Sequence, residues 1–87
     1  MVTEEKKPPV QSVERALDIL DLLADSRSAM RAADIAAALE LHPNTAHNII
    51  RTLFRRGYLL QQDDNRYALG PRCYQIGMRC NPWEQLR

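Results

Sequence analysis

The chain has 87 residues, which is enough for one small domain with a single core. Apolar residues make up 45% and charged residues 26%, so the composition favours neither a disordered nor a fibrous protein. The net charge of +1 is divided unevenly: residues 1–42 hold five Lys/Arg against eight Asp/Glu (−3), and residues 43–72 hold five Arg against two Asp (+3). This asymmetry points to a polyanion-facing surface in the middle of the chain, although a difference of this size also arises by chance.

The sequence contains no long apolar segment. Its uncharged apolar stretches fall short of the ~20 residues that a membrane span needs, and residues 1–9 lack the apolar centre of a secretory signal. Its two cysteines, Cys73 and Cys80, are too few for a disulfide-rich secreted domain. We therefore expect a cytoplasmic protein with reduced thiols and no membrane contact.

The first helix is expected after a flexible N-terminal arm over residues 1–9, where charges and two prolines occur without apolar periodicity. Ser12 is the expected N-cap, and the helix should run to Ala24 or Asp25. Ile19 and Leu22 widen its apolar surface, which indicates either a wide core face or contact with a second subunit. The main core-facing stripe is expected to contain Val13, Ala16, Leu17, Leu20, Leu23 and Ala24.

Two further helices follow a polar connection over residues 25–31. The alanine-rich residues 32–39 predict a short helix, and residues 40–42 allow a tight turn. Pro43 can open a third helix over residues 43–56, with Gly57 behind it in the left-handed C-cap position. The helical spacing of Ala46, Ile49, Ile50 and Leu53 predicts its buried face.

Two short β-prone runs, residues 58–62 and 66–69, enclose a turn-forming cluster at residues 63–65 and predict a hairpin. Residues 71–87 are expected to form a linker helix, reaching about Met78, and a frayed C-terminus. The predicted fold is mainly α with a small β-hairpin wing. It is a winged helix-turn-helix domain over residues 10–70, with the helix-turn-helix at about residues 32–51 and a three-helix core.

The exposed face of the helix over residues 43–56 carries amide, imidazole and guanidinium groups, which suit the major groove of double-stranded B-DNA. Asn44, His47 and Asn48 are the predicted base readers. The Thr45 hydroxyl is expected to bind a phosphate beside the free N–H groups of the first turn. Arg51 is placed to reach a base or a phosphate. Without the helix-turn-helix context, the same face would be interpreted as an ordinary solvated helix surface.

Three further arginines are predicted to contact the DNA backbone. Arg55 lies further along the same helix, Arg66 lies at the edge of the hairpin tip, and Arg31 lies at the start of the second helix. Asp63 and Asp64 would be repelled by phosphates, so we expect the wing to follow the backbone without deep insertion. For Arg31 and Arg66, a solvated surface position is an equally good interpretation.

Catalytic, metal-binding and cofactor-binding patterns are missing from the sequence. His42 and His47 have no Cys or carboxylate at a metal-ligand spacing, and Cys73 and Cys80 form no zinc pattern. No glycine-rich phosphate loop or nucleophile motif is present. We therefore expect no enzyme activity, no metal and no cofactor.

Three segments carry a family resemblance: SVERALDILDLLAD, DIAAALELHPNTAHNIIRTLFRRGYL and RYALGPRCYQIG. Together, over residues 11–78, they resemble the N-terminal DNA-binding domain of IclR-type bacterial transcriptional regulators. The resemblance implies a cytoplasmic repressor or activator that binds a pseudo-palindromic operator on the nucleoid as a homodimer or a pair of dimers. In such proteins helix one and the helix after the wing supply dimer contacts, which suits Ile19 and Leu22.

The chain departs from that family pattern in three ways. Glu40 stands where glycine is common in the turn, so the turn must follow another path or hold strain. Asn48 stands where arginine is common, so the operator sequence cannot be transferred. The C-terminal effector-binding domain is expected to be missing from this chain, so no small-molecule effector is expected to bind it. The alternative function is that of a winged-helix protein-interaction module without DNA binding.

Overall fold

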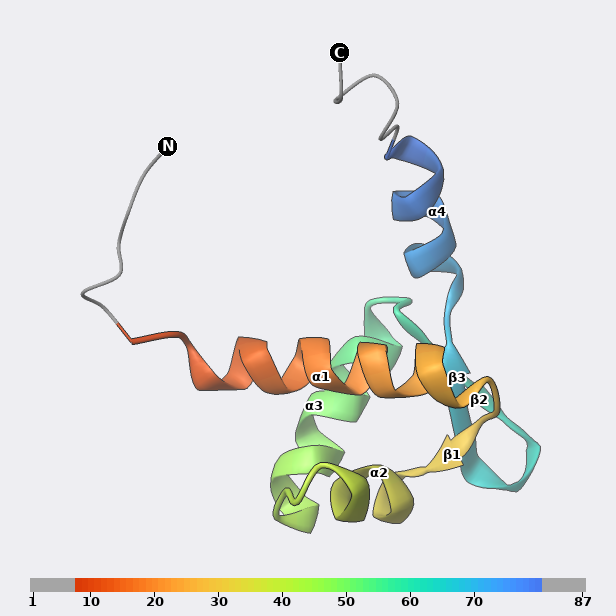
Figure 1. The fold of residues 1–87 in the computed structure, drawn as a ribbon. Coiled ribbons are helices and arrows are strands. Elements are labelled where there is room, and N and C mark those ends of the chain that lie inside the picture. Colours follow the sequence, from red (N-terminus) through yellow and green to blue (C-terminus); the bar gives the residue numbers. More distant parts are fainter. Residues whose placement is uncertain (1–7, 81–87) are drawn as a thin grey trace.

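The computed structural model describes residues 8–80 as four helices and a small antiparallel sheet (Figure 1). This confirms the predicted fold class, a mainly helical winged helix-turn-helix. Most of the expected arm at residues 1–9 and the expected C-terminal end lie outside the described residues. No helix within residues 8–80 is long and apolar enough to cross a membrane. The elements are α1 (Gln11–Ser26), β1 (Met30–Arg31), α2 (Ala32–Ala38), α3 (Pro43–Arg55), β2 (Leu59–Gln62), a 3₁₀ turn (Asp63–Asn65), β3 (Arg66–Leu69) and α4 (Pro71–Arg79).

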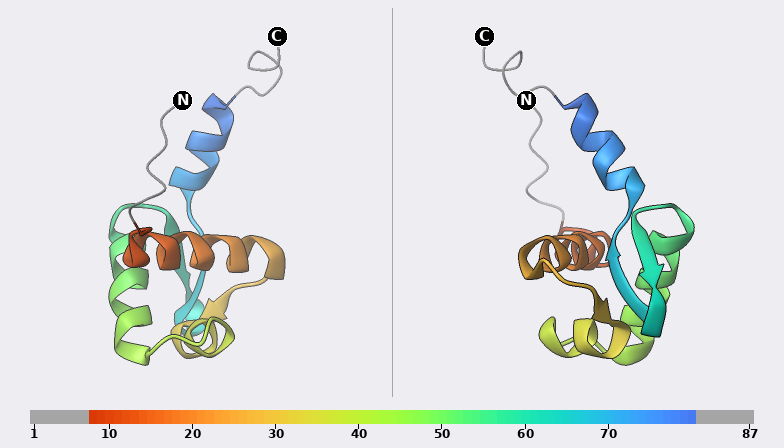
Figure 2. Two further views of the ribbon diagram at one scale, coloured as in Figure 1. Left: turned by 60° about the vertical axis from the view of Figure 1, so that its left-hand side comes forward. Right: turned by 90° about the vertical axis from the view of Figure 1, so that its right-hand side faces the viewer.

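The core lies where α1, α2, α3 and the sheet meet (Figures 1 and 2). Each of these elements contributes at least one side chain that is fully or almost fully buried. Removing a large aliphatic side chain of this kind from water stabilises a fold by about 1.5–3 kcal/mol. The buried set is Ile19, Leu23, Ile35, Ala36, Ala46, Ile50, Leu59 and Tyr67. This one cluster fixes the position of α3 relative to the wing.

The sheet has the strand order β1-β3-β2, with both pairings antiparallel. The β2–β3 hairpin and its turn at residues 63–65 confirm the predicted wing. Strand β1 was not predicted, because a two-residue strand is too short to produce an alternating pattern. It places Met30 opposite Tyr67 and Arg31 opposite Arg66. The wing is therefore joined to the start of α2 by backbone pairing.

Helix α1 differs from its prediction in its start and in its exposed face. The N-cap residue is Val10, without a side-chain hydrogen bond, so the assignment of Ser12 as N-cap is wrong. Ile19 is fully buried in the core, which confirms the wide core face and makes the alternative, contact of Ile19 with a second subunit, wrong. Leu22 is half-buried and packs against the same core. Val13, Leu17 and Ala24 were predicted to face the core but are exposed, so that part of the predicted stripe is wrong.

The turn from α2 to α3 takes a left-handed backbone conformation at Glu40, with φ at 56°. The Leu41 N–H donates to the Ala36 carbonyl at 2.8 Å, and the Glu40 N–H donates to the Ala37 carbonyl at 3.2 Å. These two bonds form a Schellman motif, in which glycine usually takes the left-handed position. The turn therefore keeps the ordinary helix-ending path and holds strain at Glu40.

Replacing Glu40 with glycine is expected to stabilise the domain. Glycine removes about 1–2 kcal/mol of left-handed strain from the folded state. Its greater flexibility in the unfolded chain lowers the free energy of unfolding by roughly 0.5–1 kcal/mol. The expected net gain is about 0.5–1 kcal/mol. Urea unfolding of the two proteins measures it, and a lower midpoint for Glu40→Gly would mean that the glutamate side chain stabilises the turn.

Helix α3 ends at Arg55, with Gly57 in the left-handed position behind its C-cap residue as predicted, and α4 begins after Gly70. Gly57 is left-handed, with φ at 88°, and the Tyr58 N–H donates to the Leu53 carbonyl at 2.8 Å. Helix α4 has Pro71 at its first turn and projects away from the core in all views (Figures 1 and 2). Its large side chains Tyr74, Ile76 and Met78 are exposed. No α4 residue belongs to the buried core cluster.

Candidate nucleic-acid interface

Helix α3 presents one polar, exposed stripe along its whole length. The opposite side is anchored in the core by Ala46 and Ile50, which are fully buried. Because a helix turns 100° per residue, positions 44, 47, 48, 51 and 55 fall within one third of its circumference. The exposed stripe consists of Asn44, His47, Asn48, Arg51 and Arg55. Thr45 lies beside it in the first turn and is half-buried.

His42 fixes the start of α3, a role that the sequence did not indicate. Its Nδ1 atom accepts a hydrogen bond from the Asn44 backbone N–H at 3.2 Å, and its carbonyl accepts from the Ala46 N–H at 3.0 Å. Pro43 occupies the first helical position, where its lack of an N–H removes no bond. His42 is an uncommon N-cap residue, so propensity did not favour it. The His42 imidazole therefore satisfies one free N–H group in the first turn of α3.

The tip of the wing is a tight turn with two consecutive left-handed residues. Asp64 has φ at 69° and Asn65 has φ at 56°, and both residue types tolerate this region better than most. The Gln61 amide Nε2 donates to the Asn65 side-chain oxygen at 3.2 Å. This hydrogen bond therefore links the end of β2 to the last residue of the turn.

The predicted backbone contacts Arg31 and Arg66 meet at the Asp64 carboxylate. Arg31 Nη2 lies 2.5 Å and Arg66 Nε 3.5 Å from the same Asp64 Oδ2 atom. The carboxylate that was expected to hold the wing away from phosphates thus binds both arginines. Arg31 is also the N-cap residue of α2. The Arg31–Asp64 ion pair joins the start of α2 to the wing tip.

An open hollow of about 610 Å³ lies between α3 and the wing and is lined by His47, Arg31, Gln61, Asp64 and Asn65, among others. Two predicted contact residues, His47 and Arg31, therefore share one concave surface. Gln61 and Asn65 also line it, although the sequence singled out neither of them. Their signal was weak, because polar residues at a hairpin tip are usual in any protein.

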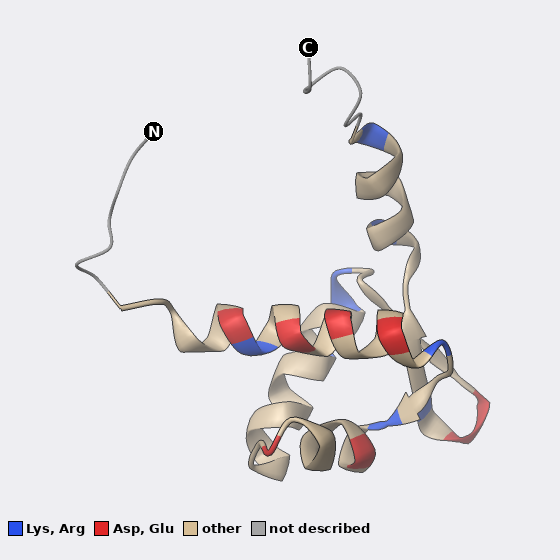
Figure 3. Ribbon diagram, in the orientation of Figure 1, with Lys and Arg blue, Asp and Glu red and all other residues tan. Residues whose placement is uncertain are grey.

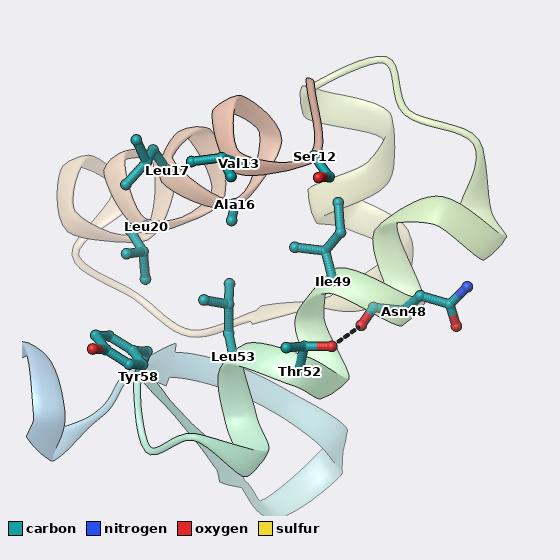
Figure 4. Close-up of a pocket in the computed structure, with 10 residues that line it drawn as sticks. All are labelled: Ser12, Val13, Ala16, Leu17, Leu20, Asn48, Ile49, Thr52, Leu53 and Tyr58. Atoms are coloured by element: carbon teal, nitrogen blue, oxygen red, sulfur yellow. Dashed lines mark hydrogen bonds between the residues drawn. The ribbon is translucent and has the colours of Figure 1, made fainter. Parts of the chain in front are cut away.

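A second hollow, of about 560 Å³, is apolar and lies on the other side of α3 (Figure 4). Val13, Leu17 and Leu20 reach it from α1, and Ile49 and Leu53 reach it from α3. Tyr58 closes one end and Asn48 borders it, while the Thr52 hydroxyl donates to the Asn48 carbonyl at 2.9 Å. We call this surface the α1–α3 groove. It places an apolar surface directly beside the polar stripe.

Acidic residues recur along α1, where the ribbon is red in Figure 3. Glu14, Asp18, Asp21 and Asp25 follow the spacing i, i+4, i+7 and i+11, which puts them on one side of that helix. Helix α3 carries Arg51 and Arg55 and no acidic residue. A polyanion would be repelled by the acidic side of α1, so the charges favour an approach to α3.

No cluster of three or more His, Cys, Asp or Glu residues suited to a metal ion lies within residues 8–80.

A three-helix core, an exposed polar third helix and a hairpin behind it define a winged helix-turn-helix domain. The IclR helix-turn-helix domain family matches residues 12–63. The chain therefore belongs to the IclR family of transcriptional regulators.

The relatives support this assignment. The chain is 42% identical over 79 residues to the glycerol operon regulatory protein of Streptomyces coelicolor, covering 90% of this chain and 31% of that protein. It is 38% identical over 71 residues to the transcriptional regulator XynR of Escherichia coli, covering 80% and 28%. The crystal structure of an IclR transcriptional regulator from Alicyclobacillus acidocaldarius superposes with a TM-score of 0.78 at 30% identity, covering 83% and 30%. The chain thus spans less than a third of the length of these relatives.

Proposed function

We propose that the chain binds double-stranded DNA in a sequence-specific manner, as the DNA-reading part of a bacterial transcriptional repressor or activator in the cytoplasm. Helix α3 enters the major groove, and two copies occupy a pseudo-palindromic operator. The half-site centres then lie ~34 Å apart or at a multiple of that distance. We assign no effector-binding site to residues 8–80.

The observation that carries this proposal is the exposed stripe of α3. Its residues have side chains that address base edges or phosphates, and its opposite side is fixed in the core. A stable reading helix needs both properties, because base recognition fails when the helix moves relative to the backbone contacts. Asn44, His47 and Asn48 lie in the first two turns and are assigned to bases. Thr45, Arg55 and the wing arginines are assigned to phosphates, and Arg51 to either.

Because Ile19 is buried, we assign the contact between the two copies on α1 to the α1–α3 groove. Val13 and Leu17 are 54% and 55% exposed and border an apolar hollow that this chain leaves open. Helix α4 offers Tyr74, Ile76 and Met78 on a segment that projects from the core. Contiguous exposed apolar surfaces of this kind favour association. We therefore assign the homodimer contact to the groove and α4.

Two alanine substitutions separate base reading from backbone binding. Asn48→Ala is expected to weaken binding to the selected sequence by about 1–3 kcal/mol and to relax the preference at one base position. Arg55→Ala is expected to weaken all sequences about equally and to reduce the slope of log K against log salt by about 1. Selection from a random duplex pool, followed by fluorescence anisotropy at several salt concentrations, measures both effects.

Arg79→Ala is the matched control for Arg55→Ala, because it removes one exposed arginine from α4 instead of α3. It should leave base preference and the salt slope nearly unchanged. A changed base preference in Arg55→Ala would contradict the division of roles. If the unaltered protein binds no duplex at low salt, the DNA-binding proposal fails and the protein-interaction module replaces it.

A further inference from the structure

The register of the sheet places two positively charged side chains opposite each other. Arg31 of β1 lies directly opposite Arg66 of β3. Like charges at directly opposed positions of an antiparallel pair destabilise the pairing. The Asp64 carboxylate contacts both guanidinium groups through one oxygen atom and compensates them. Arg31 and, 33 or more positions further along the chain, Asp64 and Arg66 thus form one ion-paired cluster at the wing, which we call the wing clasp.

We propose that Asp64 acts as an internal competitor of the DNA phosphates, holding Arg31 and Arg66 in the free protein and yielding them to a phosphate when the wing reaches the backbone. This inference rests on the proposed DNA binding and adds a specificity-determining residue to it. In that role Asp64 lowers the affinity for unselected DNA, because the wing presents paired instead of free arginines.

The strength of the clasp fits such an exchange. The side chains of Arg31, Asp64 and Arg66 are 49%, 62% and 42% exposed, respectively. Ion pairs at exposed positions are weak, since water screens them and holding the side chains costs entropy. A phosphate, which binds arginine through charge-assisted and frequently bidentate hydrogen bonds, can therefore replace the carboxylate.

The turn geometry keeps Asp64 at the contact after the exchange. Its backbone is left-handed, as is that of Asn65, and the Gln61 amide holds the Asn65 side chain. The carboxylate therefore stays close to the incoming phosphate, and the two negative charges repel each other. Binding at the wing is favourable only where the remaining contacts of α3 offset this repulsion, which is the case on a matching sequence.

The test compares Asp64→Asn with Asp63→Asn on a random-sequence duplex. Both substitutions remove one negative charge from the same turn, but Asp63 makes no ion pair within residues 8–80. Asparagine tolerates the left-handed region, so the turn should persist in Asp64→Asn. We expect Asp64→Asn to tighten binding about fivefold and to steepen the salt slope by about 1, because free arginines release more counterions. Asp63→Asn should change the affinity less than twofold.

A second comparison identifies the arginines as the cause. In a protein that already carries Arg31→Ala and Arg66→Ala, adding Asp64→Asn should tighten binding less than twofold. Equal gains from Asp64→Asn and Asp63→Asn would show a general charge effect and overturn the clasp, while leaving DNA binding intact. A fivefold gain that persists without the arginines would overturn it as well. If the unaltered protein and every variant fail to bind at low salt, the DNA-binding proposal itself fails, and the inference with it.

Discussion

Replacing Gly70 with alanine is expected to lower the free energy of unfolding by about 3 kcal/mol, the upper part of the range for forced overpacking. A Cβ atom at this position would lie 2.5 Å from the Gly57 carbonyl oxygen and 2.8 Å from the Leu59 nitrogen. Both neighbours are backbone atoms, so no side chain can rotate away. The Gly70 N–H also donates to the Tyr58 carbonyl at 2.8 Å, next to the last residue pair of the β2–β3 hairpin, Leu59 and Leu69. Thermal unfolding should show a decrease of roughly 15 °C in Tm for a domain of this size.

Gly77→Ala is the matched control, because a Cβ at Gly77 meets nothing within 4 Å. Gly77 lies inside α4, where alanine favours the helix by roughly 0.5–1 kcal/mol over glycine. The same chemical change should therefore have opposite signs at the two positions. Equal, small effects would mean that the close approach of Gly70 to the backbone of Gly57 and Leu59 relaxes easily.

The helix-turn-helix and the hairpin could be predicted from the sequence because local signals determine their ends. Helix α3 spans Pro43–Arg55 against a predicted 43–56, since Pro43 suits the first helical turn and Gly57 suits the left-handed position after the last. The turn-forming residues at 63–65 fixed the hairpin in the same way. Each of these signals acts within a few residues, so tertiary contacts need not be known.

The prediction failed where a contact between distant segments decides the outcome. Periodicity places Val13, Leu17 and Ile19 on α1, but it does not say which stripe the rest of the fold covers, so Val13 and Leu17 were predicted to be buried although they are exposed. The ion pair between Arg31 and Asp64 joins residues 33 positions apart. Its existence depends on the short strand β1, which has no sequence pattern of its own. The sequence therefore indicated the candidate interface residues along α3, but it did not indicate that Asp64 pairs with the wing arginines.

Replacing both Val13 and Leu17 with glutamine is expected to abolish the proposed dimer on DNA while the domain stays folded. These side chains are more than half exposed in the single chain, so their loss should change the free energy of unfolding by less than about 1 kcal/mol. In a dimer they would be covered, and a buried amide without a partner costs about 1–3 kcal/mol. Two linked copies gain about 10²–10⁴ in affinity over one. The double variant should therefore bind the selected duplex about 100-fold more weakly, with one copy per duplex in sedimentation experiments instead of two.

Leu60→Gln separates the groove from a general loss of surface hydrophobicity. Leu60 is 46% exposed on β2, away from the α1–α3 groove, and the substitution likewise adds no charge. This variant should keep two copies per duplex and nearly the original affinity. If the Val13 and Leu17 variant also keeps two copies, the groove is not the dimer contact. The exposed side chains of α4 would then be sufficient to hold the pair, and substitutions at Tyr74 and Met78 should separate it.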